Sequence, residues 1–117
     1  MEVEYLDHWR PLDLTATVNG VQIKKALVDI GASFNLIAFS TLKAVGMAEK
    51  RILGTPMEIT RFEEATQSTK GLIQLALKVG PIVALTQFHV INFEVSYHVL
   101  LGWLWLHKHC LIPSTYH

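Results

Sequence analysis

Two short apolar runs, each ending in a glycine, stand near opposite ends of this sequence. They are residues 26–31 (Ala-Leu-Val-Asp-Ile-Gly) and residues 99–102 (Val-Leu-Leu-Gly). Residues 26–28 and 99–101 are continuously apolar, as is typical of strands that are buried on both faces. Two such units in one chain favour an internally two-fold β-barrel in which the runs pack side by side. We therefore expect Asp29 to lie at a strand end, beside residues 100–102.

Most of the remaining chain also predicts short strands. Residues 12–18 alternate apolar and polar side chains, as a half-buried strand does. Asn19-Gly20 follows, which is the strongest two-residue signal for a β-hairpin. The same reasoning predicts further strands, with a turn at Gly80-Pro81 between the last two, at residues 21–23, 57–62, 72–79 and 82–91.

One stretch has clear helical signals. Ser40 is a suitable N-cap, residues 41–45 form about one to two turns, and Gly46 suits a left-handed helix exit. With 117 residues, half of them hydrophobic, the chain is long enough for one domain with a real core. We predict a single all-β domain over residues 1–117. It is expected to be a closed barrel with one or two short helices and a loosely ordered N-terminal arm at residues 1–10.

Charge and cysteine content restrict the partners and the location. Lys and Arg total 10 and Asp and Glu total 10, so the formal net charge is zero. A neutral chain without a basic run argues against a nucleic-acid or membrane-surface partner. Residues 1–4 are acidic, unlike a secretory signal, and the apolar stretch around residues 100–106 is too short to cross a bilayer. Because Cys110 is the only cysteine, we expect no internal disulfide and an intracellular, cytoplasmic protein.

Few residues suggest chemistry by themselves. Asp29 directly follows an apolar run, but Asp-x-Gly alone is a weak pattern that more often marks a turn. Residues 107–110 (His-Lys-His-Cys) match no strong zinc pattern, so we expect no metal and no cofactor. Ser33 lacks the Gly-x-Ser-x-Gly context of a serine hydrolase. Trp103 and Trp105 are interpreted as core or dimer anchors rather than a surface on which bases stack.

The surroundings of Asp29 resemble a known family. Residues 27–33 (Leu-Val-Asp-Ile-Gly-Ala-Ser), then Leu36-Ile37 and residues 100–102, are similar to the active-site loop and the second apolar-glycine element of retropepsin-type aspartic proteases. More specifically, the chain resembles the protease segment of plant gypsy-type LTR retrotransposon polyproteins. The segments that carry this resemblance span nearly the whole chain, at residues 26–46, 56–60, 71–91 and 97–117.

This resemblance implies a retropepsin-like barrel and an aspartic endopeptidase that acts on a polypeptide, with Asp29 as the catalytic residue. Aspartic proteases need two carboxylates that share one proton, one acting as base and the other as acid. The sequence has no second Asp-x-Gly motif. The resemblance therefore implies a homodimer, with Asp29 and its symmetry mate at the interface.

By the same resemblance, other positions take roles around the catalytic residue. The active loop is expected to bind substrate through Gly31, Ala32 and Ser33. A flap within residues 62–69 is expected to bind it through Phe62, Glu63 and Glu64. Support of the active loop and of the dimer falls on Ile30, Leu100, Leu101 and Gly102.

Three features depart from the pattern of the family. Ile30 replaces a Thr or Ser whose hydroxyl hydrogen-bonds across the dimer, so this hydrogen bond is lost. Residues 61–64 (Arg-Phe-Glu-Glu) replace a flap that contains glycines, which allow a tight mobile hairpin. Trp103 stands where the plant elements have an arginine. Two functions therefore stay open: a homodimeric aspartic endopeptidase, or a catalytically silent remnant that acts as a binding or dimerisation module.

Overall fold

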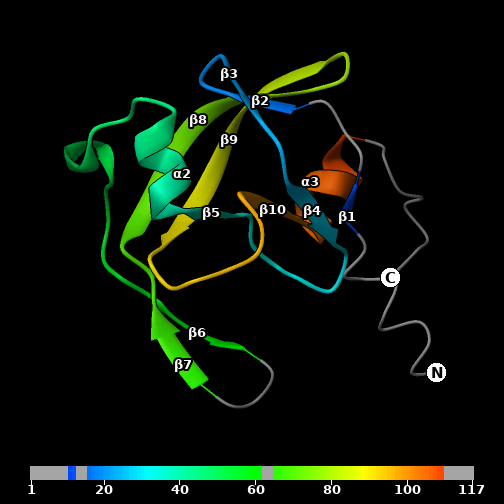
Figure 1. Ribbon diagram of the computed structural model, residues 1–117. Coiled ribbons are helices and arrows are strands. Elements are labelled where there is room, and N and C mark those ends of the chain that lie inside the picture. The colour runs from blue at the N-terminus through cyan, green and yellow to red at the C-terminus, as the bar shows by residue number, and fades with distance from the viewer. Residues whose placement is uncertain (1–10, 13–15, 62–64, 110–117) are drawn as a thin grey trace.

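The computed structural model describes residues 11–12, 16–61 and 65–109 (Figure 1). These residues are mostly β, with two short α-helices, α2 (Phe39–Ala44) and α3 (Trp103–Lys108), and one 3₁₀ turn, η1 (Glu49–Arg51). The strands are β1 (Pro11–Leu12), β2 (Ala16–Val18), β3 (Val21–Ile23), β4 (Ala26–Asp29), β5 (Leu36–Ala38), β6 (Glu58–Arg61), β7 (Ala65–Ser68), β8 (Gly71–Val79), β9 (Ile82–Ile91) and β10 (Val99–Gly102). The predicted fold class is confirmed, whereas the N-terminal arm at residues 1–10 lies outside the described residues.

One curved sheet forms a nearly closed barrel, with the strand order β1-β4-β10-β5-β9-β8-β2-β3. Strands β6 and β7 form a separate two-stranded sheet that projects from one end of the barrel (Figure 1). Strand β10 runs parallel to β4, and Gly102 lies opposite Asp29 in their register. The two apolar-glycine runs are therefore adjacent, as the sequence predicts.

Turn residues account for the two hairpins of the barrel. Asn19 and Gly20 have φ angles of 54° and 80°, which is the left-handed pair that a type I′ turn between β2 and β3 requires. Gly80 has a φ of 57° and precedes Pro81 in the turn between β8 and β9. Gly46, with a φ of 86°, ends the segment that contains α2 in the predicted left-handed exit.

Several boundaries differ from the predicted ones. The single strand predicted at residues 12–18 is two strands, since β1 pairs with β4 while β2 pairs with β3 and β8; residues 13–15 lie outside the described residues. Helix α2 begins at Phe39 and has no side-chain cap, so the prediction that Ser40 caps it is wrong. Its start is set by the sheet, because β5 pairs with β9 as far as Ala38 and the chain turns away directly after it.

The core lies inside the barrel and under the two helices. Strand β8 alternates strictly, with Ile73, Leu75, Leu77 and Val79 buried and the residues between them exposed. Strands β4 and β10 are instead buried almost throughout, as continuous apolar runs predict. Within the described part of the chain, no helix is long and apolar enough to cross a membrane.

Candidate active site

Asp29 is the last residue of β4 and is a buried carboxylate, with 7% of its surface exposed. The amide of Gly31 donates to Oδ1 of Asp29 over 2.9 Å, and the amide of Ala32 donates to the backbone oxygen of Asp29 over 3.0 Å. These two hydrogen bonds fold residues 29–32 into a tight turn of the kind that aspartate favours. The turn and the catalytic interpretations of Asp29 therefore describe one arrangement: the turn holds the carboxylate in place.

The neighbouring strand meets this loop at a residue that must be glycine. A Cβ atom at Gly102 would lie 2.6 Å from the backbone oxygen of Phe34 and 2.8 Å from that of Ala32. Both distances are far shorter than any ordinary carbon–oxygen contact. The loop that follows Asp29 thus packs its carbonyl groups directly onto Gly102. Leu100 and Leu101, which precede Gly102, are buried at 2% and 0% exposure and anchor β10 in the core.

Asn35 fastens the far end of the loop, and sequence reasoning missed it. Its Oδ1 accepts a hydrogen bond from the amide of Gly102 over 2.9 Å, and its Nδ2 donates to the backbone oxygen of Gln87 over 3.1 Å. Its backbone oxygen also accepts from the amide of His89 over 2.8 Å. One side chain therefore joins the loop to both β10 and β9. The only sequence signal is an amide residue just before a short apolar run, which is too common to single it out.

The first residue of α3 also holds the loop. The amide of Trp103 donates to the backbone oxygen of Ala32 over 2.9 Å. The indole of Trp103 stacks on His107, with the ring centroids 4.8 Å apart, whereas Trp105 is buried and donates from Nε1 to Thr86 Oγ1 over 3.2 Å. Trp105 is thus the core anchor that the sequence suggests. Trp103 lies beside the loop, in the position where the family resemblance expects an arginine.

The remaining residues of the loop differ in exposure. Gly31 and Ser33 are exposed and Ala32 is half-buried, so these three line the open side of the loop. The side chain of Ile30 is half-buried and packs against the hydrophobic core of its own chain. Because this side chain is apolar, it cannot make a hydrogen bond to the loop of a second copy.

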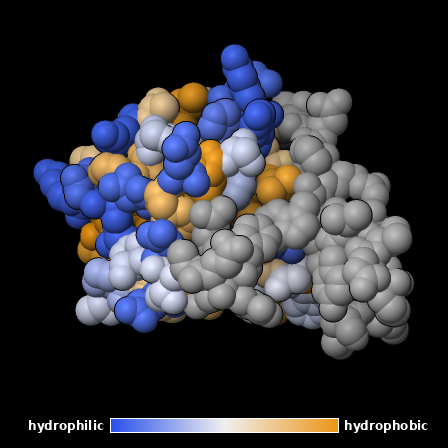
Figure 2. Space-filling view, turned by 60° about the horizontal axis from the view of Figure 1, so that its bottom comes forward, coloured by the Kyte–Doolittle hydropathy of each residue, from blue (hydrophilic) through white to orange (hydrophobic). Residues whose placement is uncertain are grey.

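Strand β7 of the β6–β7 hairpin falls within residues 62–69, the segment for which a flap is predicted. Its register pairs Glu58 with Ser68 and Arg61 with Ala65. At its base, Thr69 is buried and exchanges two hydrogen bonds with the backbone of Met57, at 3.0 Å and 2.8 Å. Phe62, Glu63 and Glu64, the predicted flap contacts with substrate, lie outside the described residues. Figure 2 brings this end of the molecule forward and shows hydrophilic and hydrophobic residues interspersed on its described surface.

Phe34 connects the loop with a titratable side chain. The Phe34 ring is 40% exposed and contacts the imidazole of His89 edge-on, with the centroids 4.6 Å apart. Burial lowers the pKa of His89 below its ordinary value of 6.5, because desolvation disfavours the charged imidazolium. The described residues contain no group of three or more His, Cys, Asp or Glu side chains placed to hold a metal ion.

No protein-family model matches the sequence, and no curated protein matches it. Solved structures do match. The retroviral protease-like domain of Ddi1 from Leishmania major aligns with a TM-score of 0.65 and 21% identity, over 83% of this chain and 75% of that one. A retropepsin-like aspartic protease from Rickettsia conorii aligns with a TM-score of 0.61 and 25% identity, over 80% and 68% of the two chains.

A viral enzyme matches over a larger share of both chains. The EIAV protease, solved in complex with the inhibitor HBY-793, aligns with a TM-score of 0.67 and 15% identity, over 90% of this chain and 91% of that one. The similarity to this enzyme therefore covers most of both chains. The chain therefore has the retropepsin-like fold of aspartic proteases.

Proposed function

We propose that this chain is an aspartic endopeptidase domain that works as a homodimer, with Asp29 as the single catalytic residue of each copy. The observation that carries the proposal is the placement of Asp29. It is a buried carboxylate at the end of β4, in an Asp-x-Gly turn, directly beside Gly102. The fold supports this reading, because the matching solved structures include a retroviral protease-like domain, a retropepsin-like aspartic protease and the EIAV protease.

The chemistry requires a second copy of the chain. One carboxylate of the pair takes a proton from water, which attacks the peptide carbonyl, and the other protonates the carbonyl oxygen and then assists the departing amine. Two carboxylates this close cannot both ionise, so the pair holds one proton and titrates as a unit. The sequence has only two other aspartates, Asp7 and Asp13, and neither stands in an Asp-x-Gly motif. A homodimer supplies the partner through its two-fold symmetry.

The remaining assignments follow from this centre. The exposed or half-buried residues Gly31, Ala32 and Ser33 contact the backbone of a polypeptide substrate, and the β6–β7 hairpin closes over it. Phe62, Glu63 and Glu64 are proposed as further substrate contacts. Ile30, Leu100, Leu101 and Gly102 support the loop and the dimer. The family resemblance adds that the substrate is a retrotransposon polyprotein of the plant gypsy type. The single cysteine, Cys110, is the basis for proposing that the protein acts inside the cell, in the cytoplasm.

One observation favours a second function, a catalytically silent binding or dimerisation module. The half-buried side chain of Ile30 packs against the core of its own chain, where the resembling proteases have a hydroxyl that reaches the partner. The loop would then keep its shape through Asn35 and Trp103, without a bond between copies. A module of this kind retains the barrel and loses turnover.

The decisive experiment measures dimerisation and cleavage together. Sedimentation at micromolar concentration is combined with a peptide-library cleavage assay between pH 4 and pH 7, for the wild type and for Asp29→Asn. We expect a concentration-dependent dimer that cleaves peptides at acidic pH, and a variant that dimerises but does not cleave. A strict monomer without cleavage would remove the protease proposal, and a dimer as inactive as Asp29→Asn would favour the silent module.

A further inference from the structure

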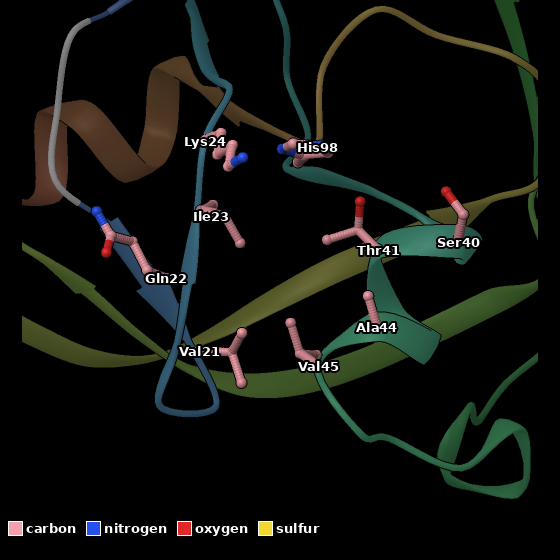
Figure 3. Close-up of a pocket in the computed structure, with 9 residues that line it drawn as sticks. All are labelled: Val21, Gln22, Ile23, Lys24, Ser40, Thr41, Ala44, Val45 and His98. Atoms are coloured by element: carbon pink, nitrogen blue, oxygen red, sulfur yellow. The ribbon is translucent and has the colours of Figure 1, made fainter.

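A hollow of about 340 Å³ lies between strand β3 and helix α2, and none of the proposed catalytic residues lines it (Figure 3). Val21 and Ile23 on β3 face Ala44, the last residue of α2, and Val45, which directly follows it, across this space (Figure 3). Val21 keeps 41% of its surface exposed, although Ile23 and Val45, which line the same space, are buried. One end of the hollow is therefore apolar and incompletely filled.

A buried hydroxyl without a partner stands at the other end. Thr41 is 5% exposed, and its Oγ1 makes no hydrogen bond with any described residue. Its methyl group lies toward β3, while its hydroxyl is directed to the side on which His98 lies (Figure 3). Buried polar groups without a partner are rare because they lose hydration without compensation, so each calls for an explanation. A ligand atom beside Thr41 would supply the missing hydrogen bond.

Two further groups give this end a definite chemistry. His98 accepts a hydrogen bond at Nδ1 from the amide of Lys25 over 3.1 Å, so the neutral ring carries its proton on Nε2 and donates there. Lys24 adds an exposed ammonium group to the lining, and none of the described residues that line this hollow is a carboxylate. An adjoining hollow of about 530 Å³ shares Lys24 and His98 and brings in one carboxylate, that of Glu94.

We propose that this hollow is a binding site for a small amphipathic carboxylate. The branched or linear hydrocarbon part would lie against Val21, Ile23, Ala44 and Val45. One carboxylate oxygen would accept from the hydroxyl of Thr41 and the other from Nε2 of His98, with Lys24 as the counter-charge. A free carboxylic acid and the C-terminal leucine of a peptide share this chemistry. The site does not depend on the proposed protease activity, since it contains none of its residues.

The test uses the full chain and two probes, 4-methylpentanoate for a free acid and N-acetyl-leucine for a peptide terminus. Each is titrated into labelled protein and followed by two-dimensional NMR, with 4-methylpentanamide as the uncharged control. We expect saturable shifts at the amides of residues 21–25, 40–45 and 98 for a carboxylate and none for the amide. The probe that saturates at the lower concentration identifies the source.

Variants separate the site from general effects. Thr41→Val keeps the shape and removes the unpartnered hydroxyl, so it should leave the melting temperature unchanged or raise it while weakening binding about tenfold. Lys24→Gln should weaken binding about two- to fivefold and reduce its salt dependence.

Ala44→Trp places a large side chain in the hollow from an exposed position and should abolish binding. Lys78→Gln, an exposed lysine outside the lining, is the matched control and should bind as the wild type does.

Two results would overturn the proposal. One is the absence of saturable shifts at these amides with either carboxylate at millimolar concentration. The other is binding that Thr41→Val and Ala44→Trp leave unchanged while both variants remain folded, because the carboxylate would then lie elsewhere.

Discussion

Ile30 directly follows the candidate catalytic aspartate, at a position where the family resemblance implies a contact with a second copy. Its half-buried side chain packs against the core, so it contributes apolar contact within its own chain and no hydrogen bond beyond it. Threonine has the same branching at Cβ and adds a hydroxyl that both donates and accepts. The position can therefore regain a polar contact without a change of backbone geometry.

We predict that Ile30→Thr strengthens the dimer about tenfold or more and raises peptidase activity. Two symmetric hydrogen bonds, each worth about 1 kcal/mol, account for that increase. Sedimentation gives the dimer constant, and peptide cleavage at acidic pH gives the activity. The double variant Ile30→Thr/Asp29→Asn is the control, which should dimerise without cleaving. An unchanged dimer constant together with unchanged cleavage would show that position 30 does not meet a partner.

Residue 102 must be glycine because the backbone of the neighbouring loop leaves no space for a Cβ atom, and not because of its backbone conformation. Gly102→Ala would place a carbon 2.6 Å from the Phe34 backbone oxygen, so the loop after Asp29 must move. We predict a loss of about 1–3 kcal/mol in the free energy of unfolding, measured by urea denaturation. Gly46→Ala is a useful comparison, because a Cβ there meets nothing within 4 Å and only the left-handed backbone, at a φ of 86°, opposes it. Equal exchange of the loop amides in wild type and Gly102→Ala would contradict this account.

At the scale of elements, Asn35 joins three of them. Its side chain bridges the loop, β10 and β9 through hydrogen bonds to the Gly102 amide and the Gln87 carbonyl. Asn35→Ala removes both and leaves their backbone partners without replacement. We predict a loss of about 1–3 kcal/mol in unfolding free energy. We also expect faster hydrogen exchange at the amides of Gly102 and Gly31, while the β2–β3 hairpin is unaffected. Uniformly faster exchange across the barrel would indicate general destabilisation instead.

Elements with local signals could be predicted from the sequence. The Asn19-Gly20 hairpin, the turn at Gly80-Pro81 and the left-handed exit at Gly46 each depend on a backbone conformation that few residues adopt. The long strand β8 has a strict burial alternation that shows directly in its residues. In the candidate site, the adjacency of Asp29 and Gly102 could also be predicted. Each of these residues comes at the end of an apolar run, and each run must be buried on both faces.

Elements that depend on distant partners could not be predicted in this way. Strand β5 has three residues, too few for a period, and exists because it lies between β9 and β10 in the sheet. Strand β7 is polar and pairs only with β6, so it shows no burial pattern. The role of Asn35 has the same origin, since both acceptor and donor partners come from strands more than fifty residues away, at separations of 52 and 67.

At the scale of the whole molecule, stability and the proposed activity respond to acid in opposite ways. The pKa of His89 is lowered in the folded chain by burial, so the unfolded chain binds a proton more readily. Folding stability therefore falls as the pH is lowered through 6.5, until the folded-state pKa is passed. The Asp29 pair, by contrast, needs acid to hold its shared proton.

We predict that His89→Phe reduces the loss of melting temperature between pH 7 and pH 5. Phenylalanine keeps a ring against Phe34 and does not titrate. The loss of melting temperature in the wild type minus that in the variant therefore gives the contribution of the imidazole. Thermal denaturation of both proteins at each pH measures it. A pH dependence that is the same in the variant would assign the acid sensitivity to other groups.

The pairing of β4 with β10 also determines when the candidate site can exist. The hydrogen bond between Asn35 and Gly102 spans 67 residues, and the parallel register joins Asp29 to the same glycine. Contacts of such long range form late, because the chain between them must be ordered before they are made. During synthesis the amino-terminal part of the chain emerges first. A nascent chain thus carries the carboxylate well before the strand and helix that shape its loop have left the ribosome.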